Sequence, residues 1–105
     1  MSFRVRLTRE AADDLDRLFD FVLQRELARE GGDLALAEQA IAAIRAGFET
    51  LRTSPFTCRK AGQNAFLREL IIPFGHSGYV ALMEIKSATD VVVIAVRHQL
   101  EDDCH

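Results

Sequence analysis

The chain has 105 residues, of which 49% are hydrophobic, so it is long enough for one domain with its own core. Its formal net charge of -3 argues against a general nucleic-acid binder, because such proteins are normally basic. No segment approaches the roughly 20 consecutive apolar residues of a membrane span, and no apolar signal-peptide core follows the first basic residues. We therefore expect a soluble cytoplasmic protein without a membrane partner.

Charge is distributed unevenly along the chain. Residues 1–50 carry 7 basic and 10 acidic side chains, whereas residues 51–100 carry 6 basic and 3 acidic ones. A surface that attracts anions is therefore expected in the second half. The two cysteines, Cys58 and Cys104, are too few for a disulfide framework, and we expect both to be reduced thiols.

The first third of the chain predicts a strand followed by a helix. Residues 3–7 alternate apolar and basic side chains, which is the period of a strand with one buried face. Thr8 is a suitable N-cap, and Gly31 and Gly32 end the helical pattern. Between these points the apolar residues recur at helical spacing: Ala11, Leu15, Leu18, Phe19, Val22, Leu23 and Leu27.

A second helix is predicted directly afterwards. Asp33 can cap it, and Pro55 lies just past its end. Because only a few residues separate the two helices, they should form an antiparallel hairpin. Neither helix can bury its apolar side alone, so a sheet must cover what the hairpin leaves open. The seam of the second helix follows spacings of three and four residues: Leu34, Ala37, Ile41, Ile44, Phe48 and Leu51.

The second half predicts a loop over residues 56–65 and then a meander of three antiparallel strands. These strands cover residues 66–72, ended by Pro73, and then residues 79–85 and 91–96. The last one is an unbroken apolar run, which favours the interior of a sheet, and the first strand should join at an edge or beside it. The order β-α-α-β-β-β predicts one α+β domain, with an antiparallel four-stranded sheet packed against the helical hairpin.

A positive segment separates the helices from the meander. Arg52, Arg59, Lys60 and Arg68 lie in a stretch that contains no acid. Guanidinium groups suit phosphate and carboxylate, although a solvated loop would explain the same charges. Four charges without an aromatic ladder do not identify a nucleic-acid site.

The polar run after the last strand holds the candidate catalytic group. His98 lies near Asp102 and Asp103, which could orient it as a general base, and a surface hydrogen-bonding role is the simpler alternative. His98, Cys104 and His105 lack the paired spacing of metal ligands. No glycine-rich phosphate loop and no nucleophile set is present, so we expect no metal and no cofactor.

The order of elements, together with three motifs, resembles the RelE/ParE superfamily of bacterial toxins from type II toxin–antitoxin modules. The motifs are residues 5–15 (Val-Arg-Leu-Thr-Arg-Glu-Ala-Ala-Asp-Asp-Leu), residues 66–70 (Phe-Leu-Arg-Glu-Leu) and residues 95–105 (Ala-Val-Arg-His-Gln-Leu-Glu-Asp-Asp-Cys-His). The Gly78-Tyr79-Val80 entry to the strand at 79–85 fits as well. The resemblance covers essentially the whole chain, and the C-terminal motif is its most specific part.

Within the superfamily, the RelE-like branch implies a ribosome-dependent mRNA endoribonuclease. Cleavage by a 2′-hydroxyl needs cations for the phosphate and groups that move protons. The sequence departs from that pattern, with Glu69 among the expected cations, Val80 where the nuclease carries an arginine and Cys104 where a tyrosine is expected. The catalytic residues that this branch would leave are Arg68, Arg97 and His98.

The ParE-like branch is more similar, in the Arg-Glu-Leu strand, the Gly-Tyr-Val entry and the C-terminal motif. It implies a toxin that binds and poisons DNA gyrase, with no catalytic residues of its own. A member of the superfamily that has lost toxicity is a third interpretation. The target-binding residues that the ParE likeness implies are Arg68, Arg97, His98, Gln99, Glu101, Asp102 and Asp103.

The same resemblance implies a cognate antitoxin. The C-terminal segment of the antitoxin would fold on the toxin, against the sheet and the helical hairpin. The antitoxin would bind operator DNA, and no specific DNA binding is expected of the toxin alone. The toxin residues expected at this contact are Leu18, Val22, Arg59, Lys60 and Arg68.

Overall fold

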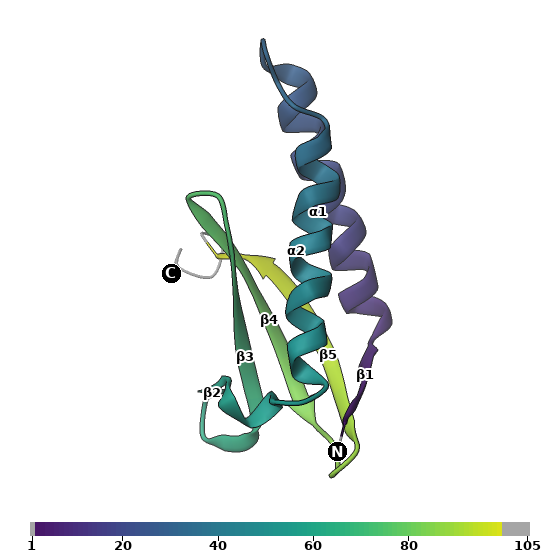
Figure 1. The fold of residues 1–105 in the computed structure, drawn as a ribbon, viewed down its shortest axis with the longest axis vertical. Coiled ribbons are helices and arrows are strands. Elements are labelled where there is room, and N and C mark those ends of the chain that lie inside the picture. The colour runs from purple at the N-terminus through teal and green to yellow at the C-terminus, as the bar shows by residue number, and fades with distance from the viewer. Residues whose placement is uncertain (1, 100–105) are drawn as a thin grey trace.

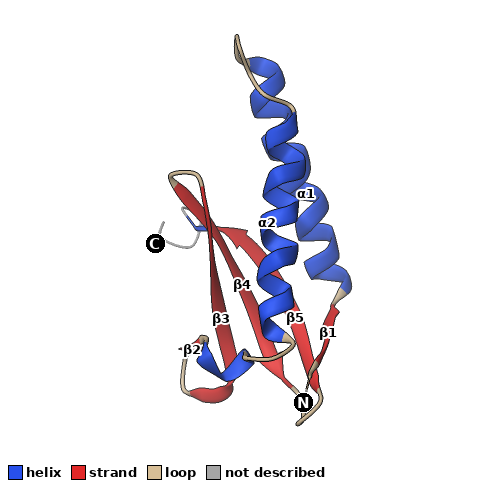
Figure 2. Cartoon of the chain, viewed as in Figure 1, coloured by secondary structure: helices blue, strands red, loops and turns tan. Residues whose placement is uncertain are grey.

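The computed structural model describes residues 2–99, which form a helical hairpin packed on one face of a sheet (Figure 1). This confirms the α+β class and the antiparallel pair of helices. Figure 2 shows the hairpin extending well past one end of the sheet. The elements in chain order are β1 (Arg4–Leu7), α1 (Arg9–Ala28), α2 (Ala35–Leu51), the short 3-10 helix η1 (Pro55–Thr57), β2 (Arg59–Ala61), β3 (Asn64–Phe74), β4 (Ser77–Ile85) and β5 (Asp90–His98).

The sheet differs from the prediction in its strand number and in one direction. It has five strands in the order β1-β5-β4-β3-β2, and β1 runs parallel to β5, whereas four antiparallel strands were expected. The additional strand, β2, lies inside the segment predicted as a loop. It forms because Gly62, at φ 74°, allows a tight turn between Ala61 and Asn64, which pair with each other. The first strand is both an edge strand and a neighbour of β5, as expected.

Pro73 lies inside β3, although the sequence predicted that it would end that strand. Within residues 2–99, β2 pairs with Asn64, Arg68 and Glu69 of β3, and no described strand pairs with the far half of β3 on that side. A proline is tolerated there because the missing N–H has no ladder partner to lose. The strand continues to Phe74, opposite Ser77.

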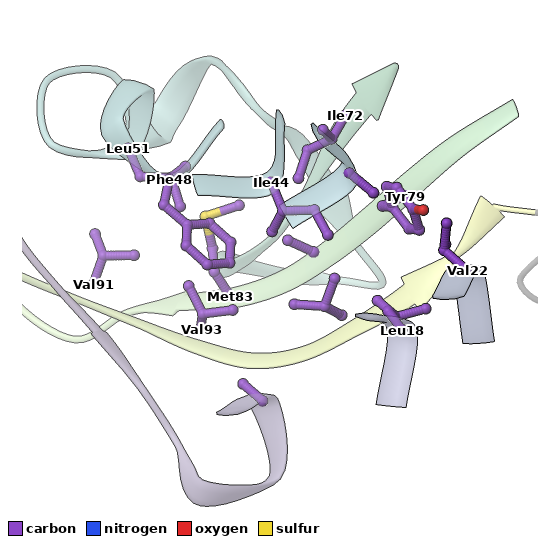
Figure 3. Packing of buried hydrophobic residues seen from close by; sticks show 14 of the residues in the cluster. Leu18, Val22, Ile44, Phe48, Leu51, Ile72, Tyr79, Met83, Val91 and Val93 are labelled. Atoms are coloured by element: carbon purple, nitrogen blue, oxygen red, sulfur yellow. The ribbon is translucent and has the colours of Figure 1, made fainter. Parts of the chain in front are cut away.

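The core fills the space between the hairpin and the sheet. α1 packs over β5 and α2 over β3. Val91, Val93 and Val96 are completely buried, which confirms β5 as an interior strand. Figure 3 shows the side chains that meet there, including Leu18, Val22, Ile44, Phe48, Leu51, Ile72, Tyr79 and Met83. Within the described residues, no helix is both long enough and apolar enough to span a membrane.

The start of α1 is joined to β5 at an irregularity of the strand. The β4–β5 register shifts by one residue where Leu82 pairs with Ala95 and Met83 pairs with Val93, so Ile94 has no partner opposite it. The Thr8 hydroxyl donates to the Ile94 carbonyl at 3.1 Å and also accepts from the Ala11 N–H at 3.1 Å, which confirms it as the N-cap. One turn later, an Asp14 carboxylate oxygen accepts from the Val96 N–H at 2.9 Å.

Glu26 holds the tip of the helical hairpin together. Its side chain is 1% exposed; Oε1 accepts from the Asp33 N–H at 3.0 Å, and Oε2 accepts from Arg25 at 3.0 Å and Arg29 at 3.3 Å. Gly32 lies so close that a Cβ there would be 1.9 Å from the Glu26 carbonyl oxygen. Asp33 then accepts from the Ala35 N–H at 3.0 Å, although the N-cap of α2 is Leu34, one residue later than the sequence predicted.

We predict that Glu26→Gln destabilises the fold in a pH-dependent way. The Asp33 N–H, followed by the two arginines, lowers the pKa of Glu26 below its ordinary value of 4.5, against the opposing effect of burial. A lowered folded-state pKa contributes stability above the unfolded-state pKa, and this stability is lost as the pH falls through the folded-state value. In urea unfolding at pH 7, the free energy of unfolding of the variant should therefore be lower than that of the wild type. The difference between the two should narrow below a pH of about 4.

Glu30→Gln is the matched control for this prediction, because Glu30 is an exposed carboxylate in the same turn. It should leave the unfolding midpoint close to that of the wild type throughout the range. A gap between wild type and Glu26→Gln that stays constant with pH would contradict the role assigned to the carboxylate.

Candidate functional site

The face of the sheet that the helices do not cover has an apolar centre. Alternation along the strands places Ile71, Val80 and Leu82 on this open face, because their neighbours Ile72, Tyr79 and Met83 point into the core. Ile71 is 38% exposed. A shallow hollow of about 160 Å³ lies in the middle of the open face, lined by Glu69, Val80, Leu82, Ala95 and Arg97.

Paired charges border this apolar centre. Arg59 on β2 lies 2.9 Å from Glu69 on β3, and Lys86 lies 3.0 Å from Glu84 at the end of β4. On the opposite edge, Arg6 of β1 lies 3.9 Å from Asp90 of β5. Exposed ion pairs of this kind contribute little to stability, about 0–1 kcal/mol each. Their arrangement gives the open face an apolar middle and a polar margin.

Arg97 and His98 do not form one site. Both belong to β5, although the sequence placed them after the strand, so their side chains point to opposite faces of the sheet. Arg97 lies on the open face beside Glu69 and Val80. His98 lies on the helix side, with Nε2 3.2 Å from the Ser77 hydroxyl and its ring edge-on to Tyr79 at 5.6 Å.

Several of the other candidate residues follow the end of β5. Gln99 comes directly after the strand and is half-buried. Glu101, Asp102, Asp103, Cys104 and His105 lie outside the described residues.

Within 2–99, no group of three His, Cys, Asp or Glu side chains lies close enough to hold a metal ion. Burial raises the pKa of Cys58, so this thiol stays protonated near neutral pH and is a poor nucleophile.

Arg68 serves the fold. Its Nε donates to the Ala65 carbonyl at 2.7 Å. Its Nη1 donates to two carbonyls, that of Phe56 at 3.1 Å and that of Cys58 at 2.9 Å. The guanidinium carbon also lies 5.4 Å from the centre of the Phe56 ring. These contacts fasten η1 and the start of β2 to β3. The sequence could not indicate this role, because the carbonyl acceptors are up to 12 residues away along the chain.

The expected antitoxin contacts separate into buried and exposed residues. Leu18 and Val22 are each only 2% exposed, because the apolar stripe of α1 faces the sheet. The folded chain alone therefore offers little of these two side chains to a partner, and their place in the antitoxin contact stays a prediction. The exposed apolar residue on this part of α1 is Phe21, at 56%. Arg59 and Lys60 lie exposed on the edge strand β2.

A second hollow lies on the helix side of the sheet, and sequence analysis did not identify it. It has a volume of about 570 Å³ and lies between the helical hairpin, the β3–β4 turn and the end of β5. Burial raises the pKa of Tyr79 in its wall, and the charge of Arg25 opposes that effect. The lining is Arg25, Arg29, Leu36, Gln39, Phe74, Gly75, His76, Ser77, Tyr79 and His98.

We predict that Arg68→Ala lowers the free energy of unfolding by about 1–3 kcal/mol, because it removes a charged donor from three backbone carbonyls. Arg59→Ala, which breaks a more exposed ion pair on the neighbouring strand, should cost at most about 1 kcal/mol. Chemical denaturation of both variants tests the difference. Equal stability of the two variants would show that the Arg68 contacts stabilise the fold no more than an exposed ion pair does.

Two comparisons place the chain among known proteins. Residues 5–103 match the family model described as ParE toxin of type II toxin-antitoxin system, parDE. A chain of the solved structure "Chromosomal ParDE TA system from P. aeruginosa" shares the fold, with a TM-score of 0.70 at 18% identity over 91% of this chain and 95% of that one. No curated protein sequence matches this chain. Because the family model spans nearly all of the sequence, the chain belongs to the ParE family of type II toxins.

Proposed function

We propose that this toxin acts by binding DNA gyrase and trapping it, and that it performs no chemistry of its own. The C-terminal end of β5, with Arg97 on the open face, is the surface that we assign to the target. Gln99 and the segment at 101–103 continue from this end in the sequence. A recognition surface needs exposed groups in fixed positions, and this end of β5 meets that need because β4 pairs with it as far as His98 and Asp14 of α1 binds the Val96 N–H.

The surroundings of Arg97 are the observation that carries this proposal. Phosphodiester cleavage needs several cations around the reacting phosphate and a group that transfers a proton. Here Arg97 is opposite Val80 in the β4–β5 ladder and lines a hollow together with Glu69, whose carboxylate pairs with Arg59. Arg68 is occupied by backbone carbonyls, and His98 points to the other face. The three residues that a nuclease would require are therefore apart, which favours a binding toxin over a nuclease.

The open face also supports a simple route to neutralisation. Its apolar centre and polar margin suit an amphipathic antitoxin segment, with apolar side chains on the exposed Ile71 and the half-buried Leu82 and acidic side chains near Arg59 and Lys60. Arg97 lies in the same hollow as Val80 and Leu82. An antitoxin segment that covers the apolar centre would thus also cover the proposed target-binding arginine.

We predict that Arg97→Ala reduces toxicity at least tenfold, whereas His98→Ala reduces it less. The reason is that Arg97 faces outward on the open face, while His98 contacts Ser77 and Tyr79. The measurement is survival after induction in bacteria, with DNA and protein synthesis followed separately. Arg9→Ala, at an exposed position near the start of α1, is the control.

The outcomes of this experiment distinguish the candidate functions. A halt in DNA synthesis that a resistant gyrase allele relieves supports the proposal. A rapid halt in translation with cleaved mRNA would instead support the RelE-like nuclease. Equal loss of toxicity in Arg97→Ala and His98→Ala would also favour the nuclease. Normal growth on induction of the wild type would indicate a family member that has lost toxicity.

For the antitoxin, we predict that Ile71→Asp weakens binding at least tenfold. The substitution places a carboxylate in the apolar centre, where an apolar partner side chain would have to desolvate it. Titration calorimetry with the co-encoded antitoxin measures the effect. Phe21→Asp makes a similar change on an exposed residue of α1 and should leave binding within about threefold if the sheet face is the contact. If Phe21→Asp weakened antitoxin binding more than Ile71→Asp did, the contact would instead be assigned to the helical hairpin.

A further inference from the structure

The hollow on the helix side of the sheet has the composition of an anion site. It is lined by two arginines and two histidines, together with the amide of Gln39 and the hydroxyl of Ser77. Among the described residues, 2–99, that line it, none is an aspartate or a glutamate. The proposed toxic function does not use this hollow, because it lies on the opposite side of the sheet from Arg97.

The two arginines are held in position by a buried carboxylate. Arg25 lies in the last turn of α1, and Arg29 is the extended C-cap residue directly after the helix. Glu26 accepts one hydrogen bond from each, at 3.0 Å and 3.3 Å, through the same Oε2 atom. A guanidinium has five N–H donors, so each arginine retains donors for a ligand. Glu26 also accepts from the Asp33 N–H, so the anchor is fixed to the hairpin turn.

The opposite wall adds further donors and an aromatic surface. The β3–β4 turn contributes His76 and Ser77, and β5 contributes His98. Tyr79 lies 6.0 Å from Phe74 and 5.6 Å from His98, measured between ring centres. Guanidinium groups on the hairpin side therefore face imidazole and aromatic rings on the sheet side, across a hollow of about 570 Å³. Pockets of roughly 300–1,000 Å³ hold small organic ligands.

We propose that this hollow binds a nucleotide, with its phosphate on Arg25 and Arg29 and its base against the half-buried ring of Phe74. A phosphate has more acceptor oxygens than a carboxylate, and the donors here come from α1, α2, the β3–β4 turn and β5. The source of the ligand is either a free nucleotide or the phosphorylated end of a DNA single strand.

The test is a titration of the full-length ¹⁵N-labelled chain, followed by NMR. The probes are ATP and a 5′-phosphorylated single-stranded DNA trinucleotide, compared at one ionic strength. Saturable shifts at Gln39, His76 and Ser77 are expected with at least one probe. The tighter of the two identifies the source of the ligand. An acidic peptide that produces these shifts while neither probe does would overturn the proposal, as would the absence of saturable shifts with all three.

A pair of variants makes the test specific to the hollow. Gln39→Glu places a carboxylate in the lining of the hollow. The fold tolerates this substitution because Gln39 is exposed on α2, and nucleotide binding should weaken about tenfold. Gln63→Glu makes the same change in the exposed turn before β3, outside the hollow, and should leave binding within about twofold. Equal affinity of the two variants would contradict the assignment. Binding is measured on the purified chain, so its result does not depend on whether the toxin acts on gyrase.

Discussion

The hydrogen bonds between the start of α1 and β5 are the constraint on which both faces of the sheet depend. A one-residue irregularity at Ile94 interrupts the β4–β5 ladder and leaves backbone groups of β5 that must find other partners. Thr8 bonds the Ile94 carbonyl and Asp14 bonds the Val96 N–H, so the helix supplies those partners. The Thr8 N–H adds a third bond, to the Val93 carbonyl at 2.9 Å. Residues more than 80 positions apart in the chain are thereby fixed together, and the irregularity sets which side chains at the end of β5 face outward.

Because β5 is fixed in this way, its last two residues serve two different surfaces. Arg97 continues the row of Ala95 on the open face, and His98 continues the row of Val96 toward the helices. A shift of the β5 register by one residue would exchange these rows. Arg97 would then enter the wall of the helix-side hollow, and the imidazole of His98 would lie beside Glu69. The separation of a recognition face from a cation-lined hollow therefore follows from the backbone register alone.

The sequence predicted the features that repeat with a period and missed those that depend on distant backbone atoms. The three- and four-residue spacing located both helices, Thr8 and Asp33 located their starts, the second to within one residue, and the run at 91–96 identified the interior strand. β2 was missed because three residues carry too little periodic signal, and it depends on the turn at Gly62 and on pairing with β3. Arg68 was interpreted as an anion contact because its charge is visible in the sequence, whereas its carbonyl acceptors are not. The division between Arg97 and His98 was within reach, since extending the alternation of β5 by two residues would have predicted it.

The arrangement of the open face also bears on how a toxin of this kind can be kept inactive. Covering an apolar centre supplies binding free energy of about 25 cal/mol per Å² of apolar surface removed from water. The charged margin contributes less to affinity and more to the choice of partner. If Arg97 is needed for the target, an antitoxin that covers the open face would gain its affinity from Ile71 and Leu82 and its inhibitory effect from the nearby arginine. Inhibition then requires no conformational change, because the sheet offers one rigid surface to two competing partners. Substitutions at the apolar centre would mainly alter affinity for the antitoxin, whereas substitutions at the margin would mainly alter which antitoxin is accepted.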